Sequence, residues 1–147
     1  MIMTNLSYSK TPFWYWIISL LAFLWYALGA YYFISQAYNT SAYRSMYSPE
    51  QLMVVDKMPV WAIAAFGLAV FVGLVGVIGM FLKKNWSKTL FLISLFAIIL
   101  QYVYNVFIGK MYELFSLAEN IRYFIIPIIA FLLYYIVSNV SKRNWFR

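Results

Sequence analysis

Cysteine and histidine are both absent from this chain of 147 residues. Without them the chain cannot form disulfides, Cys/His zinc sites, iron–sulfur clusters or histidine-ligated haem. The usual Ser-His-Asp and Cys-His catalytic arrangements are excluded as well. We therefore predict no catalytic residue, no cofactor site and no metal site, and we expect a protein that is not an enzyme.

Charged residues are also scarce. They make up 10% of the chain, which contains only four acids, whereas hydrophobic residues make up 65%. Soluble domains are typically about half apolar and about a quarter charged. A soluble fold of this length could not bury so much apolar surface, because a short chain leaves a large share of its surface exposed. The composition indicates an integral membrane protein.

Long apolar runs occupy four parts of the chain: residues 13–35, 59–82, 89–108 and 121–139. About 20 apolar residues in a helix, at about 1.5 Å each, span the roughly 30 Å hydrocarbon core of a bilayer. None of the runs has a charged residue at its centre. They predict an all-α membrane protein, a single domain of residues 1–147 in which four transmembrane helices form an up-down-up-down bundle.

The segment between the first two runs contains the signals of a short helix. Ser48 is a favourable N-cap, Pro49 suits the first helical position, and Gln51 stands at the capping-box position. We expect a short helix that lies at the outer membrane surface, followed by Asp56 at the positive end of the second transmembrane helix. A second short helix is expected within residues 109–120.

Basic residues predict the orientation. With four spans, the N-terminus, the loop 83–88 and the C-terminal tail share one side of the membrane. That side carries seven cations and no acid: Lys10, Lys83, Lys84, Lys88, Lys142, Arg143 and Arg147. Cytoplasmic loops are enriched in Lys and Arg, so both termini are predicted to be cytoplasmic. The net charge of +7 is then explained by topology and by contact with membrane lipid, and no nucleic-acid partner is expected.

Small residues form one face of the second predicted helix. Ala65, Ala69 and Gly73 are spaced by four, and Gly76 follows three residues later. Such faces allow close approach of membrane helices. The face is predicted to pack inside one bundle, to form the seam of a homo-oligomer, or to slide during a conformational change.

The third predicted helix carries the most polar group inside the membrane. Gln101 and Asn105 share a face with Ser94, and Tyr104 lies near the edge of that face. Because an unpartnered amide in lipid costs several kcal/mol, these side chains must face protein or a wet cavity.

Aromatic residues are expected at the same level of the membrane. Trp25 and Tyr26 lie near the middle of the first predicted helix, and Pro127 is expected to break the fourth. The polar group either forms hydrogen bonds between helices or lines a pocket open to the outer side. The candidate pocket residues are Trp25, Tyr26, Gln101, Tyr104 and Asn105. Their amides, phenols and rings suit a neutral polyhydroxy solute, a lipid headgroup or a quinone-like ring.

Four stretches in the middle of the chain carry a resemblance to a known family. They are MPVWA at residues 58–62, FLKK at 81–84, LISL at 92–95 and QYVYN at 101–105. The chain resembles a family of small four-span bacterial membrane proteins often labelled "sugar transporter", whose function is not established. The resemblance implies a four-helix fold in the bacterial inner membrane and a role in transport, and it carries over no substrate residues.

Two functional interpretations follow. Small size, the small-residue face and the lack of chemical groups favour a non-enzymatic accessory or scaffold subunit of a larger membrane complex or homo-oligomer. The alternative is a small carrier or binder of a neutral, sugar-like solute or a lipid through the outer pocket.

Overall fold

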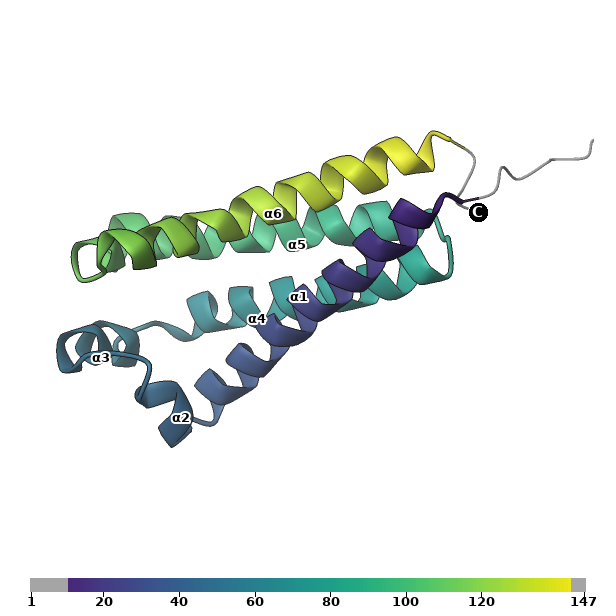
Figure 1. The fold of residues 1–147 in the computed structure, drawn as a ribbon. Coiled ribbons are helices and arrows are strands. Elements are labelled where there is room, and N and C mark those ends of the chain that lie inside the picture. The colour runs from purple at the N-terminus through teal and green to yellow at the C-terminus, as the bar shows by residue number, and fades with distance from the viewer. Residues whose placement is uncertain (1–10, 144–147) are drawn as a thin grey trace, which may run out of the picture.

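Four long helices dominate the computed structural model of the chain, which describes residues 11–143 (Figure 1). They are α1 (Phe13–Ala37), α4 (Val60–Phe81), α5 (Trp86–Val103) and α6 (Leu117–Ser141). Each is long and apolar enough to cross a membrane, α5 together with the turn that continues it to Ile108. The predicted all-α four-helix bundle is confirmed, and the chain is a multi-pass membrane protein. Lys10 and Arg147, which entered the topology prediction, lie outside the described residues.

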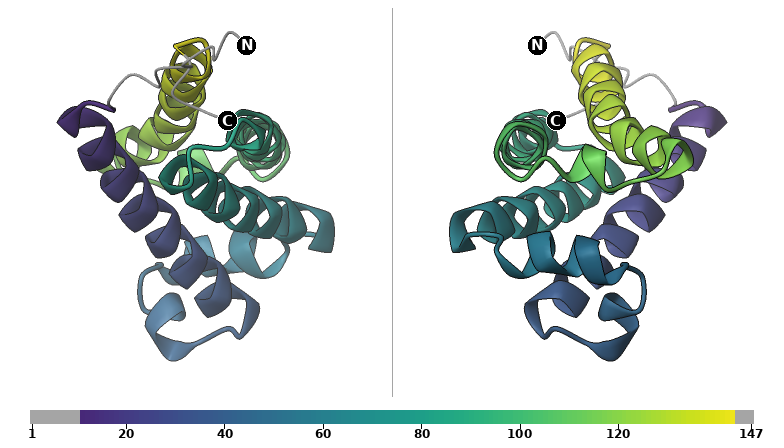
Figure 2. Two further views of the ribbon diagram at one scale, coloured as in Figure 1. Left: turned by 90° about the vertical axis from the view of Figure 1, so that its right-hand side faces the viewer. Right: turned by 90° about the vertical axis from the view of Figure 1, so that its left-hand side faces the viewer.

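The helices are arranged in chain order. α4 packs against α1 and α5, and α5 packs against α6. α1 lies at a marked angle to α6 (Figures 1 and 2). One end of the bundle, here named the terminal end, holds the start of α1, the α4–α5 turn and the end of α6. The opposite end, here named the capped end, holds the short helices α2 (Ser41–Arg44) and α3 (Pro49–Asp56).

Most helix bounds agree with the apolar runs, but α6 begins four residues before the predicted start of the fourth span. The reason is a capping box at its N-terminus. The Ser116 hydroxyl accepts a hydrogen bond from the Glu119 amide at 3.3 Å, and the Glu119 carboxylate accepts one from the Ser116 amide at 2.7 Å. Pro127 lies inside α6 without interrupting it, so the expected break is wrong.

The small-residue face of α4 is buried inside the bundle. Ala65, Ala69, Gly73 and Gly76 are all buried. A Cβ atom added at Gly73 would collide with the ring of Tyr26 from α1, whereas one at Gly76 would only touch Phe91 of α5 at 3.4 Å. The glycines therefore admit aromatic rings from neighbouring helices of the same chain.

Hydroxyl groups bind backbone carbonyls of α4. The Ser94 hydroxyl donates to the carbonyl oxygen of Ala69 at 2.7 Å, and the Ser87 hydroxyl donates to that of Gly76 at 2.6 Å. The Tyr15 hydroxyl donates to the Met80 carbonyl at 2.7 Å. Small side chains leave the carbonyls of Ala69 and Gly76 accessible, and such bonds between membrane helices contribute about 1 kcal/mol each.

The connections between the long helices at the capped end, residues 38–59 and 109–116, are here named the lid. The predicted helix forms as α3, where Ser48 and Gln51 complete the capping box. The Gln51 side chain also donates to the Leu114 carbonyl at 3.0 Å, which ties α3 to the α5–α6 connection. That connection contains only a single 3₁₀ turn, η2 (Met111–Glu113), in place of the second short helix expected within 109–120.

Asp56 is not found where it was expected. It ends α3 and pairs with Arg44 of α2, with 3.0 Å between guanidinium and carboxylate, while Pro59 caps the start of α4. Both members of the pair are well exposed to solvent. The ion pair therefore links the two short helices of the lid on its outer surface.

A candidate binding cavity at the capped end

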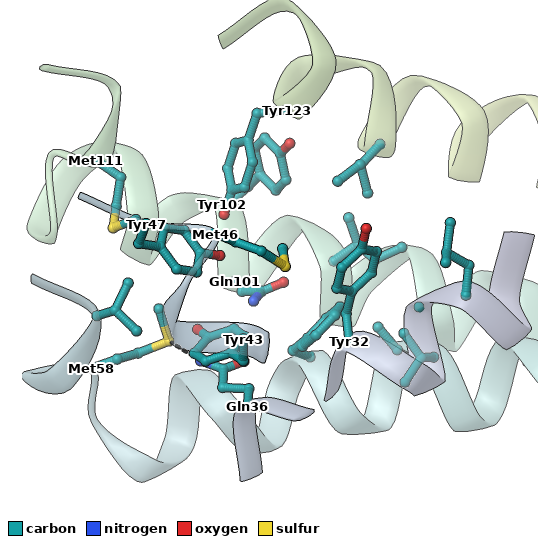
Figure 3. Close-up of a pocket in the computed structure, with 18 of the residues that line it drawn as sticks. Tyr32, Gln36, Tyr43, Met46, Tyr47, Met58, Gln101, Tyr102, Met111 and Tyr123 are labelled. Atoms are coloured by element: carbon teal, nitrogen blue, oxygen red, sulfur yellow. Dashed lines mark hydrogen bonds between the residues drawn. The ribbon is translucent and has the colours of Figure 1, made fainter. Parts of the chain in front are cut away.

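A cavity of about 270 Å³ lies at the capped end, between the four long helices and beneath the lid (Figure 3). Its volume equals that of about nine waters in the liquid, at about 30 Å³ each. Protein interiors contain few voids larger than a single water, so this cavity is more than a packing defect. Its polar and thioether lining comprises Gln36, Gln101, Tyr26, Tyr32, Tyr43, Tyr47, Tyr102, Tyr123, Met46, Met58 and Met111.

Gln101 provides the most informative polar group of the cavity. It projects from α5 toward the middle of the labelled side chains in Figure 3. No residue of the described range 11–143 forms a hydrogen bond with its side-chain amide. Gln101 is half-buried, and its amide carries two donors and an acceptor that face the cavity. The side chain is therefore placed to bind a molecule that occupies the cavity.

A second unmet group comes from Tyr102, the next residue of α5. Its phenol oxygen is buried and has no hydrogen-bond partner among residues 11–143. The ring stacks on Tyr123 of α6, with 4.8 Å between the centroids. The stacking holds the ring in place. Two adjacent residues of α5 that line the cavity thus each have a polar group without a partner among residues 11–143.

The lid contributes soft, adaptable side chains. Met46, Met58 and Met111 line the cavity, and the Gln36 amide donates a long hydrogen bond to the sulfur of Met58 at 3.5 Å (Figure 3). Methionine is flexible and polarizable, so it adapts to ligands of different shape. This part of the wall favours a hydrophobic or ring-bearing portion of a ligand.

The cavity is uncharged. Among residues 11–143, none that lines it is acidic or basic. Burial raises the pKa of the Tyr43 phenol above its usual range, and the neighbouring Tyr47 adds to the shift. Burial is also the main cause of the raised pKa of Tyr47. Both phenols remain protonated near neutral pH, so the site is suited to an uncharged ligand.

The structure brings three of the five candidate pocket residues together. Trp25, Tyr26 and Gln101 line the cavity. Tyr104 instead packs edge-on against Trp61 of α4, with 5.3 Å between the centroids. Asn105 is buried, and its amide donates to the phenol oxygen of Tyr123.

A π-helical turn, η1 (Tyr104–Ile108), follows α5 and contains both of these residues. In a regular helix, residues four apart share a face. A π turn makes its backbone hydrogen bonds over five residues, as between the amide of Gly109 and the carbonyl of Tyr104 at 2.8 Å. Asn105, predicted on the face of Gln101, and Tyr104, predicted near its edge, are instead engaged with Tyr123 and Trp61.

The lid residues of the cavity were not predicted. Tyr43, Tyr47 and Met111 come from segments that the sequence places outside the spans. The signal was the composition of the first connection, where tyrosine and methionine recur at Tyr38, Tyr43, Met46 and Tyr47. A connection that only faced water would contain more charged and fewer aromatic residues.

Fold and cavity together define a class: a multi-pass membrane protein with a lidded, uncharged cavity at one end of a four-helix bundle. Comparisons of the chain with protein-family models, with curated proteins and with solved structures found no match.

Proposed function

We propose that this membrane protein binds a small uncharged molecule in the cavity at its capped end and acts as a carrier or receptor for it, without enzymatic activity. The observation that carries the proposal is the amide of Gln101, which has no partner among residues 11–143 and lies in an uncharged cavity of about 270 Å³. Binding sites typically combine apolar walls with a few convergent polar groups, and this cavity has that character.

The chemistry of the wall narrows the ligand to a class. Amides and phenols can both donate to and accept from hydroxyl or carbonyl groups, whereas aromatic rings and methionines favour an apolar face. An uncharged molecule with hydroxyl groups fits both requirements. A polyhydroxy ligand is also in line with the resemblance to the family labelled "sugar transporter".

The small-residue face no longer favours a scaffold role. On α4, the ring of Tyr26 fills the space beside Gly73, and the ring of Phe91 lies beside Gly76, both from the same chain. A partner protein could not use that face without displacing these rings. The preference for an accessory or scaffold subunit depended in part on this face, and the cavity supports the binding role more directly.

The test compares two amides of the same helix region. We expect Gln101→Leu to fold with the thermal stability of the ligand-free parent but to lose any small molecule that co-purifies with the parent in gentle detergent, as recorded by native mass spectrometry. Asn105→Leu should instead lower the stability by about 1 kcal/mol, because it removes the bond to Tyr123. A parent that carries no small molecule, or a Gln101→Leu variant that retains it, contradicts the proposal.

We further propose that the membrane is the bacterial inner membrane, with both termini cytoplasmic, so that the cavity faces outward. The cations of the α4–α5 turn support this orientation. The chain has no cysteine, so single cysteines can be placed freely. Exposed Asn85, in that turn, and exposed Ser45, in the lid, are suitable positions. In intact spheroplasts, Ser45→Cys should react with an impermeant thiol reagent and Asn85→Cys should not. The reverse labelling contradicts the orientation.

A further inference from the structure

A second hollow lies beside the cavity, between α1 and α6. This groove, of about 320 Å³, is lined by six hydrophobic residues: Ile18, Leu21, Ala22, Trp25, Ile129 and Leu133. Trp25 also lines the cavity at the capped end. The groove and the cavity therefore meet at this one side chain.

The same two helix faces continue from the groove into the cavity. On α1, residues 18, 21, 22 and 25 line the groove, and residues 25, 28, 29, 32 and 36 line the cavity. On α6, residues 133 and 129 line the groove, and residues 126 and 123 line the cavity. Steps of three and four residues remain on one face of a helix. The groove and the cavity thus follow one another along the same faces of α1 and α6, the groove with hydrophobic side chains and the cavity with hydrogen-bonding ones.

The groove opens toward the membrane. Leu21 is 59% exposed, and it lies in the middle of a helix that spans the bilayer. What surrounds such a surface in a membrane is hydrocarbon. From Ile18 to Trp25 the groove follows seven residues of α1, or about 10 Å at about 1.5 Å per residue. Its shape and lining suit an extended hydrocarbon chain.

We infer that the ligand is a lipid with an uncharged, hydroxyl-bearing headgroup. The headgroup occupies the cavity beside Gln101, and the hydrocarbon chain leaves past Trp25 along the groove. This inference rests on the proposed function, which accounts for the headgroup, and it adds a site for the hydrocarbon chain of the lipid. Lipid tails are as apolar as the groove, so the chain gains little contact energy there. Its effect is to hold the ligand in the bilayer and to let the headgroup reach the cavity sideways, between α1 and α6.

The test uses monoolein, an uncharged lipid with two free hydroxyl groups, and the full chain in phosphatidylcholine nanodiscs. Ile129→Trp fills the groove. Its matched control is Ile128→Trp, because Ile128 is the neighbouring residue of α6, is 57% exposed and lies outside the groove. We expect saturable binding of radiolabelled monoolein that Ile129→Trp weakens at least tenfold and that Ile128→Trp changes by less than twofold. Gln101→Leu should weaken it about tenfold, because one or two hydrogen bonds are lost.

The outcomes separate the two proposals. If Gln101→Leu weakens binding about tenfold but Ile129→Trp binds monoolein like the parent, the groove carries no chain and this inference is wrong, while the proposed function stands. If no saturable binding occurs and the parent carries no other small molecule, both proposals fail. Ionised oleate with the same chain is the charge control, and binding as tight as that of monoolein would overturn the uncharged headgroup.

Discussion

The two ends of the bundle use the same helices in different ways. Toward the terminal end, α4 and α5 approach closely, because glycine leaves room and the hydroxyl of Ser87 binds the carbonyl of Gly76. Toward the capped end, α5 carries Gln101 and Tyr102 and encloses the cavity together with the other long helices, and the Gln101 amide has no partner among residues 11–143. The comparison shows that small residues with hydroxyl partners close a membrane bundle, whereas aromatic and amide side chains around a shared space keep it open.

The difference also has an energetic side. The hydroxyl groups of three residues each donate a hydrogen bond to a backbone carbonyl of α4, which stabilises the bundle by about 1 kcal/mol per bond. These residues are Ser87, Ser94 and Tyr15. Gln101 and Tyr102 forgo such bonds within residues 11–143. Unmet polar groups are rare in native interiors, and they concentrate where a protein binds something else. The capped end thus gives up stability that the other end retains.

The largest effect is expected at the close contact between α1 and α4. We predict that Gly73→Ala destabilises the protein by about 1–3 kcal/mol, because its new methyl group would occupy the space of the buried Tyr26 ring. Gly76→Ala, three residues later on the same helix, should be neutral or slightly stabilising, because alanine is the better helix former and only touches Phe91. Thermal unfolding in detergent measures both. Equal stability of the two variants would contradict the packing described here.

A smaller effect separates two polar residues of α5. We predict that Ser94→Ala lowers the free energy of unfolding by about 1 kcal/mol, because the bond to the Ala69 carbonyl is lost. Gln101→Leu should not lower it, since its amide bonds to nothing within residues 11–143. Denaturant unfolding of the ligand-free protein tests this pair. If Gln101→Leu is the more damaging change, the amide has a structural role and the contrast between the two ends disappears.

The smallest effect concerns pH. Burial raises the pKa of Tyr43 and Tyr47, and an exposed tyrosine ionises near pH 10. Between pH 5 and pH 9 these phenols are neutral in both the folded and unfolded states, so we expect ligand affinity and stability not to change through them. Above about pH 10 the unfolded state loses these protons more readily, so stability should fall as the pH rises.

The control for the pH series is Tyr43→Phe, which should show a smaller loss of stability above about pH 10 than the parent. Ligand titrations and thermal unfolding across the series provide the measurements. A steep change in ligand affinity between pH 5 and pH 9 would show that an ionisable group acts in the cavity, which contradicts its uncharged character.

Local patterns were sufficient to predict most of the fold. The apolar runs predicted four spanning helices, because about 20 hydrophobic residues have few alternatives to a membrane helix. The capping box at Ser48 predicted α3, because its hydrogen bonds form within four residues. The same pattern at Ser116 and Glu119 was present in the sequence and would have predicted the true start of α6. These features depend on neighbours along the chain, so the sequence alone determines them.

The cavity depends on contacts that no local pattern contains. Gln101, Trp25 and Tyr43 are far apart in the chain, and only the crossing of the helices and the folding of the lid bring them around one space. Asn105, in the π turn after α5, bonds to Tyr123, although its spacing from Gln101 predicted a place in the pocket. The choice of partner for each polar side chain depends on which groups come within about 3 Å, and that is decided by tertiary packing. Sequence alone determined a four-helix membrane protein with a few costly polar groups, and only the tertiary structure decided which of those groups are bonded and which remain available to a ligand.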